Sequence, residues 1–157
     1  MEIFGKPSIN PFFFYTGKSG GYLTWLILAL ALAGIKLPGS HSWFINNLVG
    51  VFLLLAGLMV ILLSLINLGS SVSIGLPKGD TKLKSSGLYA ISRNPMYIGM
   101  GLVTIASMVY TLNSFVFLAG IYSIIVYHFI IIGEEKFLKE RFGKDYDHYM
   151  SKVDRYL

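Results

Sequence analysis

The sequence predicts an all-α protein, an integral membrane bundle of about four transmembrane helices. Three observations predict it. Of the 157 residues, 54% are apolar and only 13% are charged, against about 25% charged in soluble domains, and the mean hydropathy is +0.64. Four long apolar runs are separated by short polar segments. The basic residues gather in some of those segments. With no cysteine in the chain, disulfides and thiolate metal sites are excluded.

The first two expected spans cover about 21–37 and 43–68. The second exceeds the roughly 20 residues that a bilayer requires. Before the first, the aromatic residues 12–15 beside Lys18 are typical of a segment at the membrane interface. Along the second span a small residue recurs every seven positions, which predicts a helix-packing seam. The residues of this stripe are Gly50, Gly57, Ser64 and Ser71.

The last two expected spans cover about 96–111 and 115–132. Only residues 112–114 separate them, so we expect a tight antiparallel hairpin. With four spans, every Lys and Arg except Lys36 falls on one side of the membrane. The positive-inside rule then places both termini and the loop 70–95 in the cytoplasm. We interpret the net charge of +5 as this topology signal rather than as a nucleic-acid surface.

The polar segment 81–99 organises the rest of the chain. It combines three basic residues with Tyr89 and Tyr97. Proline disfavours the α conformation in the residue before it and is well tolerated at the first position of a helix. Asn94-Pro95 therefore predicts a turn that opens a helix near Met96. The basic residues are Lys82, Lys84 and Arg93.

After Ile132 the sequence becomes strongly polar. Leu138 and Phe142 share one helical face, and Gly143 is placed where a helix ends. A second short helix is expected to carry Tyr146 and Tyr149.

Two acidic residues, Glu134 and Glu135, follow the fourth span directly. Because spans three and four form a hairpin, we expect Asn94, Tyr97 and Glu134 to approach one another. Acidic groups at a membrane edge need partners. One interpretation is a functional site, and the other is simple pairing of the glutamates with basic residues at the interface. From spacing alone the two interpretations carry equal weight. The candidate pairing residues are Lys136, Lys139 and Arg93.

Two motifs in this region resemble those of a known family. The first is Gly87-x-Tyr89-x-x-x-Arg93-Asn94-Pro95-x-Tyr97-x-Gly99. The second is Glu134-Glu135-x-x-Leu138-x-x-x-Phe142-Gly143-x-x-Tyr146-x-x-Tyr149. In this order, and separated by one helical hairpin, they are similar to the motifs of the isoprenylcysteine carboxyl methyltransferases and related phospholipid methyltransferases. The resemblance covers about residues 70–157.

The resemblance implies a single membrane methyltransferase-like domain over 1–157, with N-terminal spans in 1–69 and a cofactor-binding core in 70–157. It implies S-adenosylmethionine as the cofactor, held between the cytoplasmic loop and the short C-terminal helices. It implies catalytic roles for Tyr97, Glu134 and Arg93. The implied cofactor-binding residues are Thr81, Lys82, Leu83, Lys84, Tyr89, Asn94, Pro95, Met96, Tyr97 and Glu134.

Two positions depart from the carboxyl methyltransferase pattern. Asn94 stands where histidine is common, and an amide cannot titrate near neutral pH. Ile130 stands where an arginine precedes the first glutamate by one turn, and an arginine would suit a carboxylate acceptor. His128 lies nearby, and a lone histidine in a membrane helix is more often packed and hydrogen-bonded than catalytic.

We therefore predict methyl transfer to a membrane-embedded, lipid-like acceptor whose headgroup is a carboxylate or an amine. Two other readings stay open. A nicotinamide-dependent membrane reductase of the sterol type would use the basic loop residues for a phosphate. A non-enzymatic membrane module is disfavoured because no charged residue lies in mid-span. No metal site and no nucleic-acid partner are expected, and the predicted location is the inner membrane of a prokaryote.

Overall fold

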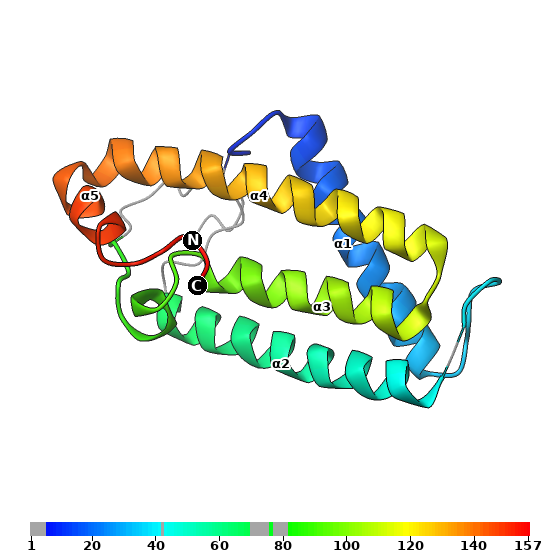
Figure 1. Cartoon of the computed structure of the whole chain (residues 1–157). Coiled ribbons are helices and arrows are strands. Elements are labelled where there is room, and N and C mark those ends of the chain that lie inside the picture. The colour runs from blue at the N-terminus through cyan, green and yellow to red at the C-terminus, as the bar shows by residue number, and fades with distance from the viewer. Residues whose placement is uncertain (1–5, 42, 70–75, 77–81) are drawn as a thin grey trace.

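The computed structural model describes residues 6–41, 43–69, 76 and 82–157 (Figure 1). Within this part of the chain the regular structure is helical, and the only β-type pairings are two isolated bridges. This confirms the all-α prediction. The elements are α1 (Pro11–Leu32), α2 (Phe44–Leu68), the 3-10 turn η2 (Gly87–Ala90), α3 (Pro95–Thr111), α4 (Ser114–Phe142) and α5 (Lys144–Met150).

The helices begin and end at residues with recognisable capping chemistry. Pro95 is the first residue of α3, as predicted. Asn113 caps α4, because its side chain accepts hydrogen bonds from the N–H groups of Phe115 and Val116. Leu112 adopts a left-handed conformation with φ of 43°, which makes the sharp turn of the α3–α4 hairpin. Gly143 ends α4 with φ of 51°.

Three predicted boundaries are wrong. The first span was expected to run to 37, but α1 ends at Leu32. Helix α1 begins ten residues before the expected span at 21–37, because the Asn10 side chain caps it at Pro11. The aromatic residues 12–15 are therefore helical. Helix α4 does not end near Ile132 but continues to Phe142. Gly133 does not break the helix. The Ser8 backbone packs against it so closely that a Cβ atom there would clash with the Ser8 carbonyl oxygen. The polar stretch after Ile132 thus extends the same helix.

Among the described residues, α2 and α4 are long and apolar enough to cross a membrane, and α3 is a shorter apolar helix. Helices α2 and α3 match the expected spans within a residue. Of the four expected spans, the structure thus gives two candidate membrane-spanning helices by length and composition.

Helices α2 and α3 lie side by side (Figure 1) and meet along the predicted small-residue seam. A Cβ atom on Gly57 would lie 2.9 Å from the Gly99 carbonyl oxygen, and one on Gly50 would lie 2.8 Å from the Tyr110 Cβ. Ser64 is completely buried. Such contacts let helix backbones approach closely. Ser71, the fourth residue of the stripe, lies outside the described residues.

Helix α4 lies on the other side of α3, and α1 crosses both (Figure 1). Gly17 and Gly21 of α1 lie against Val126 and Tyr127 of α4. A buried cluster forms where the three helices meet, and its members are Phe14, Tyr97, Met100, Val126, Tyr127, Ile130 and Ile131. At the end of α4, α5 folds back, and the residues after it return to the beginning of α3. This return brings the two sequence motifs together.

Candidate functional site

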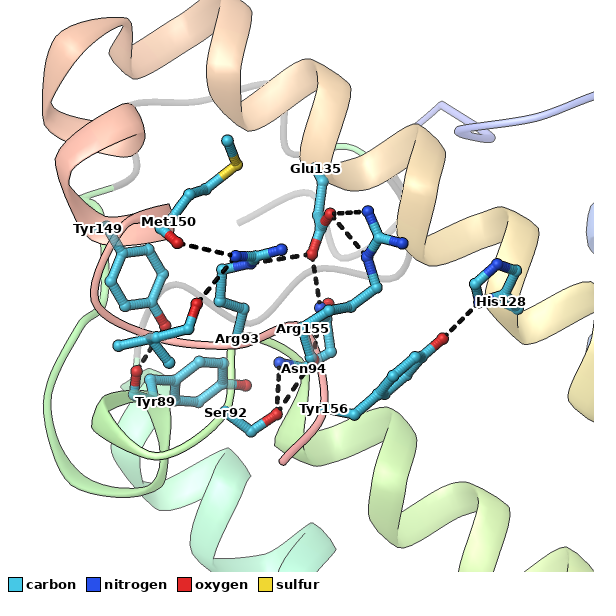
Figure 2. Close-up of polar contacts among 11 residues, drawn as sticks. Tyr89, Ser92, Arg93, Asn94, His128, Glu135, Tyr149, Met150, Arg155 and Tyr156 are labelled. Carbon is cyan, nitrogen blue, oxygen red and sulfur yellow. Dashed lines mark hydrogen bonds and ion pairs between the residues drawn. The ribbon is translucent and has the colours of Figure 1, made fainter.

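Glu135 is the centre of a buried polar cluster (Figure 2). One carboxylate oxygen, Oε1, accepts hydrogen bonds from Arg93 Nε at 3.1 Å and Asn94 Nδ2 at 3.0 Å. The other, Oε2, accepts from Arg155 Nε at 3.0 Å and lies 2.9 Å from Arg155 Nη2. The hydrogen bonds to Glu135 raise the pKa of Arg155. Both carboxylate oxygens are therefore fully engaged by groups of this chain.

A strap formed by residues 150–155 runs beside the Asn94-Pro95 turn and is held by its own backbone carbonyls. Arg93 Nη1 donates to the Val153 carbonyl at 2.8 Å and to the Met150 carbonyl at 3.3 Å. The Arg93 backbone N–H donates to the Asp154 carbonyl at 2.9 Å. Asn94 Nδ2 also donates to the Arg155 carbonyl at 3.2 Å. The turn that opens α3 is thus fixed by Glu135 and by the strap.

The short helix α5 supports this arrangement through aromatic packing. The Tyr149 hydroxyl donates to the Tyr89 carbonyl at 2.5 Å. Burial of its hydroxyl raises the pKa of Tyr149 to about 12. Tyr146, Tyr149 and Val153 form a small apolar cluster against which Leu83 packs. The loop before α3 is therefore attached to the C-terminal region by both polar and apolar contacts.

Glu134 has different surroundings from Glu135. Adjacent residues of an α-helix point about 100° apart, and Glu134 points to the side of α4 where Tyr97 lies. The Tyr97 hydroxyl donates to Glu134 Oε1 at 2.7 Å. Among the described residues, this is the one hydrogen bond that the Glu134 side chain makes. Lys18 of α1 interacts with Glu134 electrostatically. This carboxylate, unlike that of Glu135, keeps acceptor capacity for a ligand.

The charge of the Glu134 carboxylate also acts on the hydroxyl of Tyr89. Burial, the nearby Tyr149 and the Glu134 charge raise the pKa of the Tyr89 hydroxyl. Tyr89 is therefore a neutral hydroxyl near Glu134.

A cavity of about 420 Å³ lies between α3 and α4, next to the hydrogen-bonded pair of Tyr97 and Glu134. Tyr97 and Tyr127 line it, with ring centroids 6.0 Å apart. His128 and Tyr156 also line it, and the His128 Nδ1 and Tyr156 Oη atoms are 2.6 Å apart (Figure 2). Such a volume is typical of small-ligand sites. His128 is thus hydrogen-bonded, as expected from the sequence.

The structure brings together most of the predicted site. Tyr97 meets Glu134 as expected, and Asn94 and Pro95 lie buried beside them. Met96 follows in the first turn of α3. Arg93 and Asn94, however, contact Glu135 rather than Glu134. The interpretation of simple pairing therefore holds for Glu135 with Arg93. Lys139 pairs instead with Asp147 at 2.9 Å.

The loop residues before Gly87 are less closely tied to the site. Lys82 is exposed, Lys84 is half-buried, and Leu83 contacts the α5 cluster. Thr81 lies outside the described residues. The cofactor-binding roles of these four residues stay predictions.

Sequence reasoning missed three residues at the site, Lys18, Arg155 and Tyr156. Lys18 was interpreted only as part of the membrane interface. Arg155 and Tyr156 follow α5 without a local pattern that marks them, and their partners are 20 and 28 residues away in the chain.

In the described part of the chain, His, Asp and Glu form no group of three or more able to hold a metal ion.

Comparison with known proteins places this geometry in a family. The sequence model of a family described as phospholipid methyltransferase matches residues 45–145. The match begins at α2 and ends in α5, so it includes the second helix, which the motifs alone did not mark. It excludes the strap. No curated protein sequence matches the chain. The matched region holds Asn94, Tyr97 and both glutamates, and the chain belongs to the phospholipid methyltransferase family, which implies a membrane methyltransferase acting on lipid-like substrates.

Proposed function

We propose that this protein transfers a methyl group from S-adenosylmethionine to a membrane-embedded, lipid-like acceptor whose headgroup is an amine or a carboxylate. The observation that carries the proposal is the 2.7 Å hydrogen bond from Tyr97 to Glu134. It joins the two motifs in one site within a chain of this family. When bound, the cofactor would supply a methyl group on a cationic sulfur. The acceptor atom would form its bond to the methyl carbon as the carbon–sulfur bond breaks, and the neutral thioether would be the leaving group.

The residues present fit the cofactor chemically. A sulfonium is a cation, and the aromatic rings of Tyr97 and Tyr127 attract cations. In the first turn of α3, Pro95 has no N–H, and the Tyr97 and Ile98 N–H groups donate to the Asn94 carbonyl. The Met96 N–H is the donor that remains for the cofactor's carboxylate. The remaining acceptor capacity of Glu134 suits its ammonium or a ribose hydroxyl. We propose that Tyr89, Asn94, Pro95 and Met96 complete the site.

The protein's part in the reaction is positioning and exclusion of water. Arg93 and Asn94 hold the turn before α3 by binding Glu135, so we assign Arg93 a positioning role. Asn94 has no titratable proton, and an amine acceptor would lose its proton to another group. Glu134 and Tyr97 are the nearest candidates. A carboxylate acceptor needs no base.

We propose a four-span topology with both ends of the chain in the cytoplasm, based on the distribution of Lys and Arg. The donor site then faces the cytoplasm, where the water-soluble cofactor is found. Residues 70–157 form the cofactor-binding core of a single domain, and residues 1–69 complete the bundle.

Calorimetry of S-adenosylmethionine binding to the detergent-solubilised protein tests the donor site. Tyr97→Phe removes the hydrogen bond to Glu134, and Glu134→Gln replaces the charged acceptor by a neutral amide. We expect about tenfold weaker binding in each variant. Tyr110→Phe, on the same helix as Tyr97, and Glu140→Gln, exposed on α4, are the matched controls. Unchanged affinity in both site variants would contradict the proposed donor site.

The acceptor is identified by transfer of labelled methyl groups. Purified protein is incubated with membrane extract and methyl-labelled cofactor, and the labelled lipid is isolated. A base-labile label indicates an ester and a base-stable label indicates an amine. The absence of any labelled lipid, with cofactor binding intact, would overturn the methyltransferase proposal.

A further inference from the structure

The cavity between α3 and α4 begins beside Tyr97, a residue of the proposed donor site, and continues along both helices. Tyr97 contributes both to this cavity and to the pair with Glu134. Gly101 lies one helical turn further along α3 and lines the same cavity. Four residues of helix advance about 6 Å. In the proposed topology this direction leads from the cytoplasmic edge toward the bilayer interior.

Gly101 differs from the other glycines of the bundle. A Cβ on Gly99 would lie 2.7 Å from Ile61 Cγ1, and a Cβ on Gly57 would meet the backbone of α3. A Cβ on Gly101 would meet nothing within 4 Å. Packing therefore does not require glycine at 101, although glycine in a helix costs stability. The missing side chain leaves the cavity open beside Tyr97.

The cavity lining is suited to hydrocarbon. Exposed Ile125 and Phe129 from α4 form part of it together with Tyr97 and Gly101. His128 and Tyr156 also line it, and His128 Nδ1 and Tyr156 Oη are hydrogen-bonded to each other at 2.6 Å. The polar atoms left in the lining include the Tyr127 hydroxyl, which is buried without a hydrogen-bond partner among the described residues. Along the isoleucine and phenylalanine side chains, a hydrocarbon chain would displace no bound polar group.

We propose that this cavity holds the hydrocarbon chain of the lipid acceptor and that Gly101 is a specificity-determining residue, because it leaves room for that chain. The inference rests on the proposed function, which requires a lipid headgroup beside Tyr97. The hydrocarbon chain of the acceptor lies along Gly101, and its headgroup lies at the Tyr97–Glu134 pair. The space at Gly101 then sets how bulky a chain can be held.

Photo-crosslinking tests this without relying on turnover. The probe is a phosphatidylethanolamine with a diazirine in one acyl chain, added to the full chain in micelles, with labelled peptides mapped by mass spectrometry. We expect enriched labelling of residues 124–131 in the wild-type protein. Gly101→Phe and Gly101→Leu fill the cavity and reduce this labelling at least about tenfold. Gly101→Ala, the matched control, retains most of it.

The exposed lipid-facing residues of α2, such as Phe52 and Met59, provide an internal reference, because their labelling stays constant in every variant. Enrichment of residues 124–131 over this reference that disappears in the Phe and Leu variants supports the proposal. Equal labelling of both surfaces, or labelling unchanged in a folded Phe or Leu variant, overturns it. Calorimetry on the same variants separates the two proposals, since unchanged cofactor affinity leaves the donor site intact when the cavity inference fails.

Discussion

Helix α3 is held by its two neighbours in two different ways. On the α2 side, Gly57 and Gly99 allow the two backbones to approach, and no space for an added side chain remains there. On the α4 side, the contact at the N-terminal end of α3 depends on polar groups, chiefly Glu135 with Arg93 and Asn94. Between those groups and the hairpin turn, the cavity at Gly101 stays open.

The difference shows how a small helical bundle can be both stable and able to bind a ligand. Close backbone packing fixes α2 and α3 as one rigid unit but excludes any ligand between them. Attachment by a polar cluster at one end and by a hairpin at the other leaves the middle of the α3–α4 contact free. The seam therefore provides stability, and the cavity provides space.

The largest expected effect comes from breaking the polar attachment. Glu135→Ala leaves Arg93, whose side chain is only 11% exposed, without its carboxylate. Unpairing a buried charge costs about 3 kcal/mol of unfolding free energy. Unfolding in mixed detergent micelles, followed by circular dichroism, measures this loss.

Glu140→Ala is the control for that variant. Glu140 is exposed on the same helix, and exposed substitutions change stability by less than about 0.5 kcal/mol. A loss for Glu135→Ala no larger than that of the control would show that α4 is held to α3 mainly by apolar packing.

The next effect compares two alanine substitutions on α3. Gly99→Ala forces a Cβ to within 2.9 Å of the Gly57 carbonyl oxygen, and such overpacking costs about 2 kcal/mol. Gly101→Ala meets open space and gains up to about 1 kcal/mol from helix propensity. The same unfolding assay should therefore give opposite signs. Equal effects of the two substitutions would refute the contrast between the two sides of α3.

The smallest effect is expected at the exposed ion pair between α4 and α5. Lys139 and Asp147 lie 2.9 Å apart with side chains 56% and 50% exposed. Lys139→Ala should cost less than about 0.5 kcal/mol, because solvent screens such pairs. Measured against Glu135→Ala, this value tests whether burial, rather than charge alone, makes the polar attachment strong. A loss comparable to that of Glu135→Ala would remove that distinction.

Much of the fold could be predicted from local patterns. Pro95 marked the start of α3, Gly143 marked a helix end without showing that this helix continues the fourth span, and the seven-residue stripe marked the seam with α3. The errors at α1 and α4 have a shared physical cause. Polarity was used to place helix ends, but backbone capping decides them, and neither Lys18 nor Glu134 interrupts a helix.

The site was predictable only as far as the hairpin connects its parts. The approach of Tyr97 to Glu134 follows from two helices joined by a tight turn. The different partners of Glu134 and Glu135 could not be predicted in this way, because they depend on the rotation of α4 about its axis. The roles of Arg155 and Tyr156 depend on where the strap lies, and no periodic pattern encodes that.

The strap also has a consequence for the order in which the molecule assembles. The hydrogen bonds that its backbone carbonyls accept join residues 57 to 63 positions apart in the chain, and contacts of such long range form late because loop closure must precede them. Helices can enter the bilayer and associate along the seam first. The proposed donor site, whose turn before α3 the strap holds, would then form in a second stage. A newly inserted bundle would therefore have its helices packed before it could bind a methyl donor.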